Sequence, residues 1–163
     1  MKILLNSLLL LLASTLTLSA AELNPQATTQ QQNEEPIKVT YDNAYDDPGR
    51  DLDTVSCSNG ENGLKTKGYT NIGSLPTPFV GGSPTVEGWN SVNCGKCYSL
   101  SWNGTSVNVL AIDKAIGLFN VAQSALDALT NGHAVEFGSV DATYTEVDPS
   151  ECGMPAADAQ SHG

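Results

Sequence analysis

Residues 94–113, CGKCYSLSWNGTSVNVLAID, contain two cysteines, a predicted β-hairpin and an acidic residue at the end. Apolar and polar side chains alternate along both arms of the hairpin. The apolar positions are Tyr98, Leu100 and Trp102 in the first arm and Val107, Val109 and Ala111 in the second. Between the arms, Asn103-Gly104 is typical of a type I′ turn, because both central residues of that turn need a positive φ. The stretch therefore predicts two antiparallel strands with one buried face.

Turn dipeptides recur at short intervals on both sides of this hairpin, as in Asn59-Gly60 and Gly81-Gly82. Such spacing is typical of many short strands, and we expect further strands at 37–41, 134–137 and 140–147. One helix is predicted at 121–129, with Asn120 as its N-cap and Asn131-Gly132 at its C-terminus. The fold class is therefore mainly β, either a barrel or a sandwich with short helices.

Four cysteines accompany this pattern: Cys57, Cys94, Cys97 and Cys152. In an exported protein we expect them to form two disulfides, and the three pairings remain open on spacing alone. The alternatives for Cys94-Gly-Lys-Cys97 are a thioredoxin-like redox pair or half of a zinc site. Neither has its usual context, since no βαβ pattern surrounds the motif and no second C-x-x-C or histidine pair completes a metal shell. We therefore predict no metal site and no cofactor.

The first 21 residues are predicted to be a signal peptide, with a positive start at Met1-Lys2 and a mostly apolar run up to Leu18. A transmembrane anchor is the alternative, but the run is short for a span of ~20 residues and polar residues interrupt it. We expect 22–37 to be a disordered polar leader, 38–153 to be one domain and 154–163 to be a flexible tail. The product should be secreted and lie outside the cell or in the cell wall.

The chain is strongly acidic, with 7 Lys and Arg against 18 Asp and Glu and a formal net charge of -11. Nucleic acid is excluded as a partner, because phosphate binding needs clustered cations. The same scarcity of cations argues against a membrane surface of anionic lipids. Neither argument applies to neutral polysaccharides, which remain possible ligands.

Six motifs that occur in one order carry a resemblance to a known family. They are Tyr41-Asp42-Asn43-Ala44-Tyr45-Asp46, Cys57-Ser58-Asn59-Gly60, Gly73-Ser74-Leu75-Pro76, Gly88-Trp89-Asn90-Ser91, Asn93-Cys94-Gly95-Lys96-Cys97 and Val107-Asn108-Val109-Leu110-Ala111-Ile112-Asp113. From Lys38 to Cys152 the chain resembles the fungal cerato-platanins. The resemblance implies a six-stranded double-ψ β-barrel, as in the first domain of expansins, with disulfides joining Cys57 to Cys94 and Cys97 to Cys152.

The same resemblance implies a function. Cerato-platanins bind chitin oligomers and N-acetylglucosamine, can loosen cellulose or chitin without cutting it, and elicit defence in plants, and some are allergens. For this chain the expected ligands are therefore chitin or N-acetylglucosamine oligomers, and cellulose after them. A host receptor and a role in virulence are expected on the same basis.

Asp113 follows the apolar run 107–112 and is either a turn former at a strand end or a site residue. It matches the acidic residue in the shallow groove of expansin-like barrels, where a carboxylate can accept hydrogen bonds from sugar hydroxyl and amide groups. Hydrolysis would need a second carboxyl group about 5 to 9.5 Å away. The available groups are Asp42, Asp46, Asp53 and Asp141, and their spacing places none of them opposite Asp113. Because the family is regarded as lacking the catalytic base, we predict binding without catalytic residues.

Trp89, Asn90 and Asn93 form the second candidate, since an apolar ring beside amide groups suits a pyranose. The alternative is that Trp89 packs in the core near Cys94. The turn Ser58-Asn59-Gly60 either contributes polar groups to the same groove or only shapes the bend.

Three further residues have two interpretations each. Asn120 is either a helix cap or a ligand contact, and Tyr41 belongs to either the groove wall or the core. Asn103-Gly104-Thr105 is an N-glycosylation sequon in the predicted hairpin turn, although Asn-Gly is also what the turn alone would require.

The sequence thus predicts a secreted, non-catalytic carbohydrate-binding protein that is a monomer with some capacity to self-assemble. The first alternative is a weak glycanase that uses Asp113 as its general acid. The second is a surface-active structural protein that assembles at interfaces.

Overall fold

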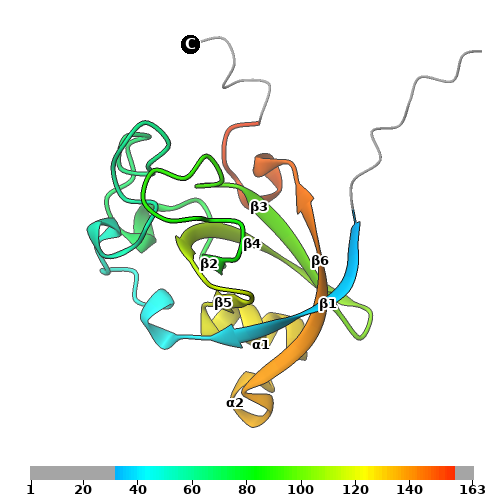
Figure 1. Ribbon diagram of the computed structural model, residues 1–163. Helices are drawn as coiled ribbons and strands as arrows, with labels where there is room; N and C mark the ends of the chain where they lie inside the picture. Colours follow the sequence, from blue (N-terminus) through cyan, green and yellow to red (C-terminus); the bar gives the residue numbers. More distant parts are fainter. Residues whose placement is uncertain (1–31, 157–163) are drawn as a thin grey trace, which may run out of the picture.

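A computed structural model describes residues 32–156 of the chain. Six strands form a closed barrel in the order β1-β5-β2-β4-β3-β6 (Figure 1). They are β1 (Gln32–Tyr41), β2 (Val80–Ser83), β3 (Cys97–Trp102), β4 (Thr105–Lys114), β5 (Phe119–Val121) and β6 (Ser139–Val147). The pairs β1·β5 and β2·β4 are parallel, and the other neighbours are antiparallel. The barrel that the resemblance implied is confirmed, and the sandwich is excluded.

The hairpin predicted from residues 94–113 is β3 and β4. Their register pairs Tyr98 with Val109, Leu100 with Val107, and Trp102 with Thr105. Asn103 and Gly104 have φ values of 47° and 79°, as a type I′ turn requires.

The strand β1 begins earlier than predicted. Residues 32–37 were expected to end a disordered leader, but Gln32 and Asn33 pair with Thr145 and Tyr144 of β6. A register shift follows before Ile37, and it accommodates Pro36, which has no N–H to donate. The polar composition was misleading because backbone groups, rather than side chains, make this pairing. The predicted signal peptide, residues 22–31 of the leader and residues 157–163 lie outside the described residues.

Two short helices follow β5, namely α1 (Gln123–Thr130) and α2 (Ala134–Phe137), and both lie at one end of the barrel in Figure 1. The expected strand at 134–137 is therefore wrong. Its apolar residues do not line a buried strand face, because Val135 is 66% exposed and only Ala134 of this segment is buried. The predicted end of α1 is confirmed, since Asn131 adopts the left-handed conformation there.

Aromatic rings fill part of the barrel interior. Tyr98, Phe119 and Tyr144 contact one another with ring centroids 5.0 to 6.0 Å apart. The core extends to Met154, which is 3% exposed, so the predicted flexible tail does not begin at residue 154. Burial of an apolar side chain outweighs its position near the end of the chain.

Both predicted disulfides are present, Cys57–Cys94 and Cys97–Cys152. The first joins the β1–β2 connection to the β2–β3 connection. The second joins the start of β3 to the 3₁₀ turn η4 (Pro149–Cys152) after β6. The first disulfide therefore ties two loops to each other, and the second ties the turn after β6 to the barrel.

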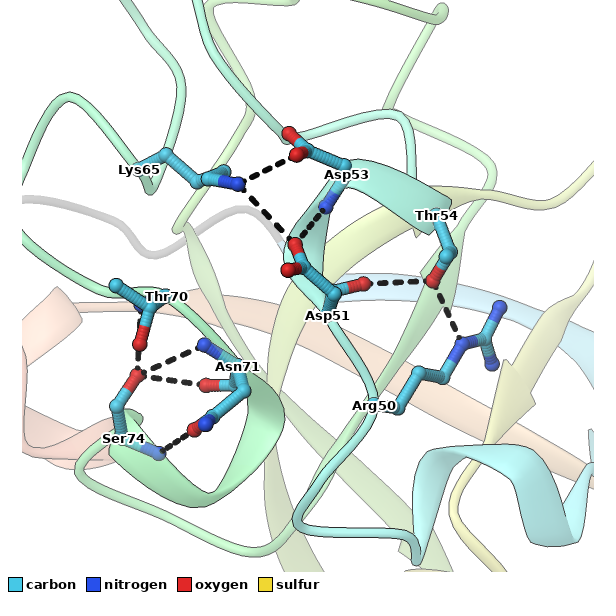
Figure 2. Close-up of polar contacts among 8 residues, drawn as sticks. All are labelled: Arg50, Asp51, Asp53, Thr54, Lys65, Thr70, Asn71 and Ser74. Atoms are coloured by element: carbon cyan, nitrogen blue, oxygen red, sulfur yellow. Dashed lines mark hydrogen bonds and ion pairs between the residues drawn. The ribbon is translucent and has the colours of Figure 1, made fainter.

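The β1–β2 connection, residues 42–79, is long and contains only the 3₁₀ turns η1 (Asn43–Tyr45), η2 (Leu52–Thr54) and η3 (Ile72–Ser74). Side-chain hydrogen bonds hold it in place (Figure 2). Lys65 contacts Asp51 at 3.1 Å and Asp53 at 2.6 Å. Asn71 and Ser74 form a capping box at η3. These contacts order a segment that is joined to the barrel strands only at a few points, such as the bond from the N–H of Cys57 to the carbonyl of Ile112.

No helix within residues 32–156 is long and apolar enough to cross a membrane.

Candidate functional site

Asp113 lies near the end of β4 and is half-buried. Its Oδ1 accepts hydrogen bonds from the backbone N–H and the hydroxyl of Ser56, at 2.9 and 2.7 Å, and from the N–H of Lys114 at 2.8 Å. Its Oδ2 accepts one from the hydroxyl of Tyr45 at 3.0 Å. A carboxylate offers about four lone-pair sites, so the acceptor capacity that remains for a ligand is small and lies on Oδ2.

Tyr45 is the buried partner of this carboxylate, and its side chain is 5% exposed. Burial raises the pKa of its hydroxyl well above the ordinary value, and the negative charge of Asp113 raises it further. The guanidinium carbon of Arg50 lies 4.9 Å from the centre of the Tyr45 ring, within the range of a cation–π contact. The phenol therefore stays protonated at neutral pH and donates to Asp113.

Trp89 lies on the surface, and its side chain is 65% exposed. Its indole N–H donates to Oδ1 of Asn59 at 2.7 Å. This bond fixes the orientation of the ring and leaves it open to solvent. The alternative in which Trp89 packs in the core is therefore wrong.

The side chain of Asn90 packs against the neighbouring turn at 58–62 and is not free on the surface. Asn90 has a positive φ of 60°, and its side-chain oxygen accepts from the N–H of Asn62 at 2.9 Å. Gly60 is required here, because a Cβ at that position would lie 2.6 Å from the Asn90 oxygen. The turn at 58–62 and the turn at 89–91 are thus packed against each other.

The residues around Asp113 and the residues around Trp89 are connected by the chain segment 56–59. Ser56 binds Asp113, Cys57 binds the carbonyl of Ile112 at 3.0 Å, and Asn59 holds Trp89. Three residues of chain span at most about 10 Å, so Asn59 is held close to the Asp113 cluster. The Cys57–Cys94 disulfide joins the same turn to the loop that carries Trp89.

The other predicted site residues have partners inside the protein. Asn93 donates from its amide to the carbonyl of Thr85 at 2.7 Å, and Ser58 is buried. Asn120 lies in β5 rather than at the N-cap of α1, and its side-chain oxygen accepts from Thr40 at 2.9 Å. Tyr41 is half-buried against the core. The structure brings Trp89, Asn59, Gly60 and Asn90 together. Asn59, Gly60 and Asn90 have structural roles there, whereas the ring of Trp89 faces solvent.

The cap of α1 comes from a residue that the sequence did not suggest. Asp46 accepts from the N–H groups of Gln123 and Ser124 at 2.7 and 3.1 Å, whereas Ala122 at the N-cap position makes no side-chain bond. The two partners are more than 70 residues apart, so no local signal could have identified them.

A pocket of about 430 Å³ lies beside Tyr45. Its walls include Tyr45, Asp46, Pro48, Pro76, Thr77 and Ser124. A second hollow of about 290 Å³ shares Asp46 and Ser124 with it. Asp113 lines neither, so it contacts the larger pocket only through Tyr45. The pocket was not predicted, because its walls come from η1, η3 and α1, which only the tertiary fold assembles.

The carboxylates considered as partners of Asp113 have other contacts. Asp53 and Asp141 pair with Lys65 and Lys38, and Asp46 caps α1. Asp42 accepts from the N–H of Ala44 and also contributes to the raised pKa of Tyr45. Within residues 32–156, no cluster of three or more His, Cys, Asp or Glu is arranged to hold a metal ion.

This fold and surface define a class of small disulfide-linked β-barrels. This chain adds an exposed, oriented tryptophan and a carboxylate held by internal donors. The cerato-platanin family profile matches residues 37–154. The chain belongs to the cerato-platanin family.

Known relatives agree with this assignment. Allergen Asp f 15 of Aspergillus fumigatus is 50% identical over 139 residues, which is 85% of this chain and 91% of the relative. The crystal structure of cerato-platanin 3 from M. perniciosa is 45% identical with a TM-score of 0.71, and the match covers 73% of this chain and 99% of that one. The solution structure of the fungal elicitor cerato-platanin is 36% identical with a TM-score of 0.64, covering 71% and 96%.

Proposed function

We propose that this chain is a secreted, non-catalytic protein that binds chitin or N-acetylglucosamine oligomers, and cellulose more weakly. The observation that carries the proposal is Trp89, which is 65% exposed and oriented by Asn59. A large exposed ring normally costs solubility, and a ring held in one orientation loses little entropy when a sugar stacks on it. The net charge of -11 favours an uncharged ligand over a phosphate or sulfate polymer.

The contacts support a path for an extended oligomer. It runs from Trp89 and Asn59, past the free side of Asp113 Oδ2, to the pocket beside Tyr45. Asn59 binds Trp89 and follows Ser56 by three residues, and Ser56 binds Asp113. Tyr45 also binds Asp113 and lines the pocket. A longer oligomer would then bind more tightly than a disaccharide, because it would reach both ends.

Binding without cleavage is supported by the surroundings of Asp113. A general acid must reach the glycosidic oxygen and deliver a proton to it. Three donors surround Oδ1 of Asp113 and the Tyr45 hydroxyl points at Oδ2. The carboxylate is therefore suited to fixing the loop at residue 56 and accepting one further hydrogen bond.

We further propose that the protein loosens wall polysaccharides without cutting them and is sensed by a host. One structural relative is named a fungal elicitor and another relative an allergen. A surface that binds released chitin fragments would also remove them from host receptors, which is the expected route to virulence.

The test is a titration followed by tryptophan fluorescence. Trp102→Phe leaves Trp89 as the single tryptophan, so its emission should change and saturate as a chitin hexamer is added. In Trp89→Ala, measured by calorimetry, affinity should fall by about tenfold or more, equivalent to about 1.4 kcal/mol. Ile116→Ala is the matched control, since Ile116 is 83% exposed and lies in the β4–β5 connection. Equal affinity in Trp89→Ala and Ile116→Ala would refute the proposal.

The second candidate is a weak glycanase that uses Asp113 together with Asp42. Both carboxylates lie near enough to Tyr45 for their negative charges to raise its pKa. The signature of the glycanase would be the release of reducing ends from chitin or cellulose. That release should disappear in both Asp113→Asn and Asp42→Asn and persist in Asp141→Asn. Release that is absent from the unmutated protein would reject the glycanase and leave the binding proposal intact.

A further inference from the structure

The β3–β4 turn carries a sequon on the side of the barrel away from Trp89. Asn103-Gly104-Thr105 is an N-glycosylation sequence, and Asn103 and Gly104 are exposed. In Figure 1 this turn and the long 42–79 connection project on opposite sides of the barrel. A group attached at Asn103 would therefore leave the Trp89 surface open.

Aromatic side chains lie next to the same turn. The rings of Trp102 and Phe137 have centroids 5.6 Å apart, and the ring centroids of His133 and Phe137 are 5.7 Å apart. Phe137 is 44% exposed. This aromatic patch, Trp102, His133 and Phe137, combines rings from β3 and from α2 with its N-cap, and it is only partly covered by the protein.

The register of the hairpin places the sequon against the patch. Trp102 and Thr105 are the last paired residues before the turn, and directly paired residues project on the same face of a sheet. Asn103 has a φ of 47°, as a type I′ turn requires, and it directly follows Trp102 in the chain. The side-chain nitrogen to which a glycan would attach is therefore separated from Trp102 by a single fixed bend of the backbone. The aromatic ring, the glycan acceptor and the sequon threonine thus occupy positions 102, 103 and 105 of one four-residue turn.

We propose that Asn103 carries an N-linked glycan and that its first N-acetylglucosamine packs on Trp102, with the next sugars extending over Phe137. The C–H groups of a pyranose face suit the negative face of an aromatic ring. The glycan would cover apolar surface that the fold leaves exposed, and it would be held at little entropic cost because the turn is already fixed.

The attachment is a glycosyl transfer from the lipid-diphosphate-linked oligosaccharide of the secretory pathway. A bond forms between the side-chain nitrogen of Asn103 and C1 of the first sugar, and the bond from C1 to the diphosphate oxygen breaks. The amide nitrogen loses one proton, and the lipid diphosphate leaves with the electron pair. The predicted signal peptide is what would bring the chain to that donor.

The first experiment measures occupancy and contact in the unmutated protein. The full chain is secreted from a glycosylating yeast, and peptide mass spectrometry should find the glycan on Asn103. After endoglycosidase trimming to one N-acetylglucosamine, the acetyl methyl protons should be shifted upfield by the indole ring and show nuclear Overhauser contacts to Trp102. An unmodified Asn103, or a methyl signal with neither the shift nor the contacts, overturns the proposal.

The second experiment separates stacking from attachment. Removing the glycan with Asn103→Asp, which still tolerates the positive φ of the turn, should lower the melting temperature by a few degrees. The same change made in a Trp102→Leu background should have no further effect. Trp102→Phe keeps an aromatic ring and should retain part of the difference in melting temperature. Trp89→Leu should leave the upfield shift of the acetyl methyl protons unchanged. An equal loss with and without Trp102 contradicts the stacking. If Trp102→Leu does not fold, the contacts measured in the unmutated protein decide the question alone.

Discussion

Single hydrogen bonds decide which polar residues of this protein are left for a ligand. Asp113 accepts four bonds from its own chain, and Asn93 and Asn120 each hold a neighbouring strand or loop. Trp89, by contrast, presents a large surface to solvent. A residue type that suits sugar recognition is therefore not sufficient evidence of a contact. The deciding quantity is the hydrogen-bonding capacity that remains after a residue's internal partners are counted.

Two buried tyrosines predict a loss of stability at high pH. Burial raises the pKa of Tyr98 to about 12, and burial together with Asp113 raises the pKa of Tyr45 further. The folded state thus holds both phenol protons more tightly than the unfolded state, in which the pKa is about 10. The resulting stabilisation is complete below about pH 10 and is lost as the pH rises through the folded pKa values, at up to about 1.4 kcal/mol per pH unit for each group.

Urea unfolding at several pH values checks this expectation. The free energy of unfolding should fall more steeply above about pH 10 in the unmutated protein than in Tyr45→Phe or Tyr98→Phe, each compared with its own value at neutral pH. Parallel curves for all three proteins would show that the tyrosines do not titrate as stated.

At the scale of elements, contacts with residues distant in the sequence take the place of local capping residues and local preferences. The helix α1 lacks a side-chain cap of its own and takes one from Asp46, which precedes it by more than 70 residues. The helix α2 contains an apolar alternation that favours a strand, but its ends are set by contacts with α1, including the bond from the N–H of Ala134 to Asp127 at 2.9 Å. Tertiary partners override local preference in both cases.

Removing the distant cap should destabilise the protein as removal of an N-cap does. Asp46→Ala is expected to cost about 1 to 2 kcal/mol in urea unfolding, because two N–H groups of α1 lose their acceptor. Asp46→Asn keeps one acceptor oxygen and should lose less. The control, Glu61→Ala, makes the same change of charge at an exposed position of the same connection. A loss in Glu61→Ala that equals the loss in Asp46→Ala would indicate a charge effect instead of a cap.

At the scale of the whole molecule, the two disulfides join different segments and have different roles. Cys57–Cys94 joins the two connections that meet at Trp89, whereas Cys97–Cys152 ties the C-terminal 3₁₀ turn to β3. Their sequence separations of 37 and 55 residues are each worth about 4 kcal/mol on the chain-entropy model. The two bonds should therefore be similar in stability and unequal in their effect on binding.

Paired substitutions separate these two effects. Cys57→Ala with Cys94→Ala should lower both the free energy of unfolding and the affinity for a chitin hexamer, because the turn that orients Trp89 is released. Cys97→Ala with Cys152→Ala should lower stability by a comparable amount, about 4 kcal/mol, with affinity retained while the protein is folded. Urea unfolding measures the free energy of unfolding, and titration calorimetry below the unfolding temperature measures the affinity. Equal losses of affinity in the two pairs would show that the first disulfide has no special role at the site.

Part of the candidate site could be predicted because its signals are local. Asn59-Gly60 is recognisable as a turn, Trp89 as a ring suited to sugars, and Asp113 as a charge at a strand end. The contact of Trp89 with Asn59 could not be predicted, nor could the pocket beside Tyr45, since each joins segments from different connections. The start of β1 was missed for a related reason, because backbone pairing with β6 does not require apolar side chains.

From the order of its residues alone, this protein's central hairpin and its turn at Asn103-Gly104 could be predicted, because both depend on alternation and turn chemistry within residues 94–113. Its family could be identified from six motifs that follow one another between residues 41 and 113. Only the tertiary structure decided that Trp89 is exposed, that Asp113 is largely occupied by its own chain, and that Asp46 caps α1. Exposure and hydrogen-bond capacity depend on which distant segments meet, and the closure of the barrel and the disulfides bring those segments together.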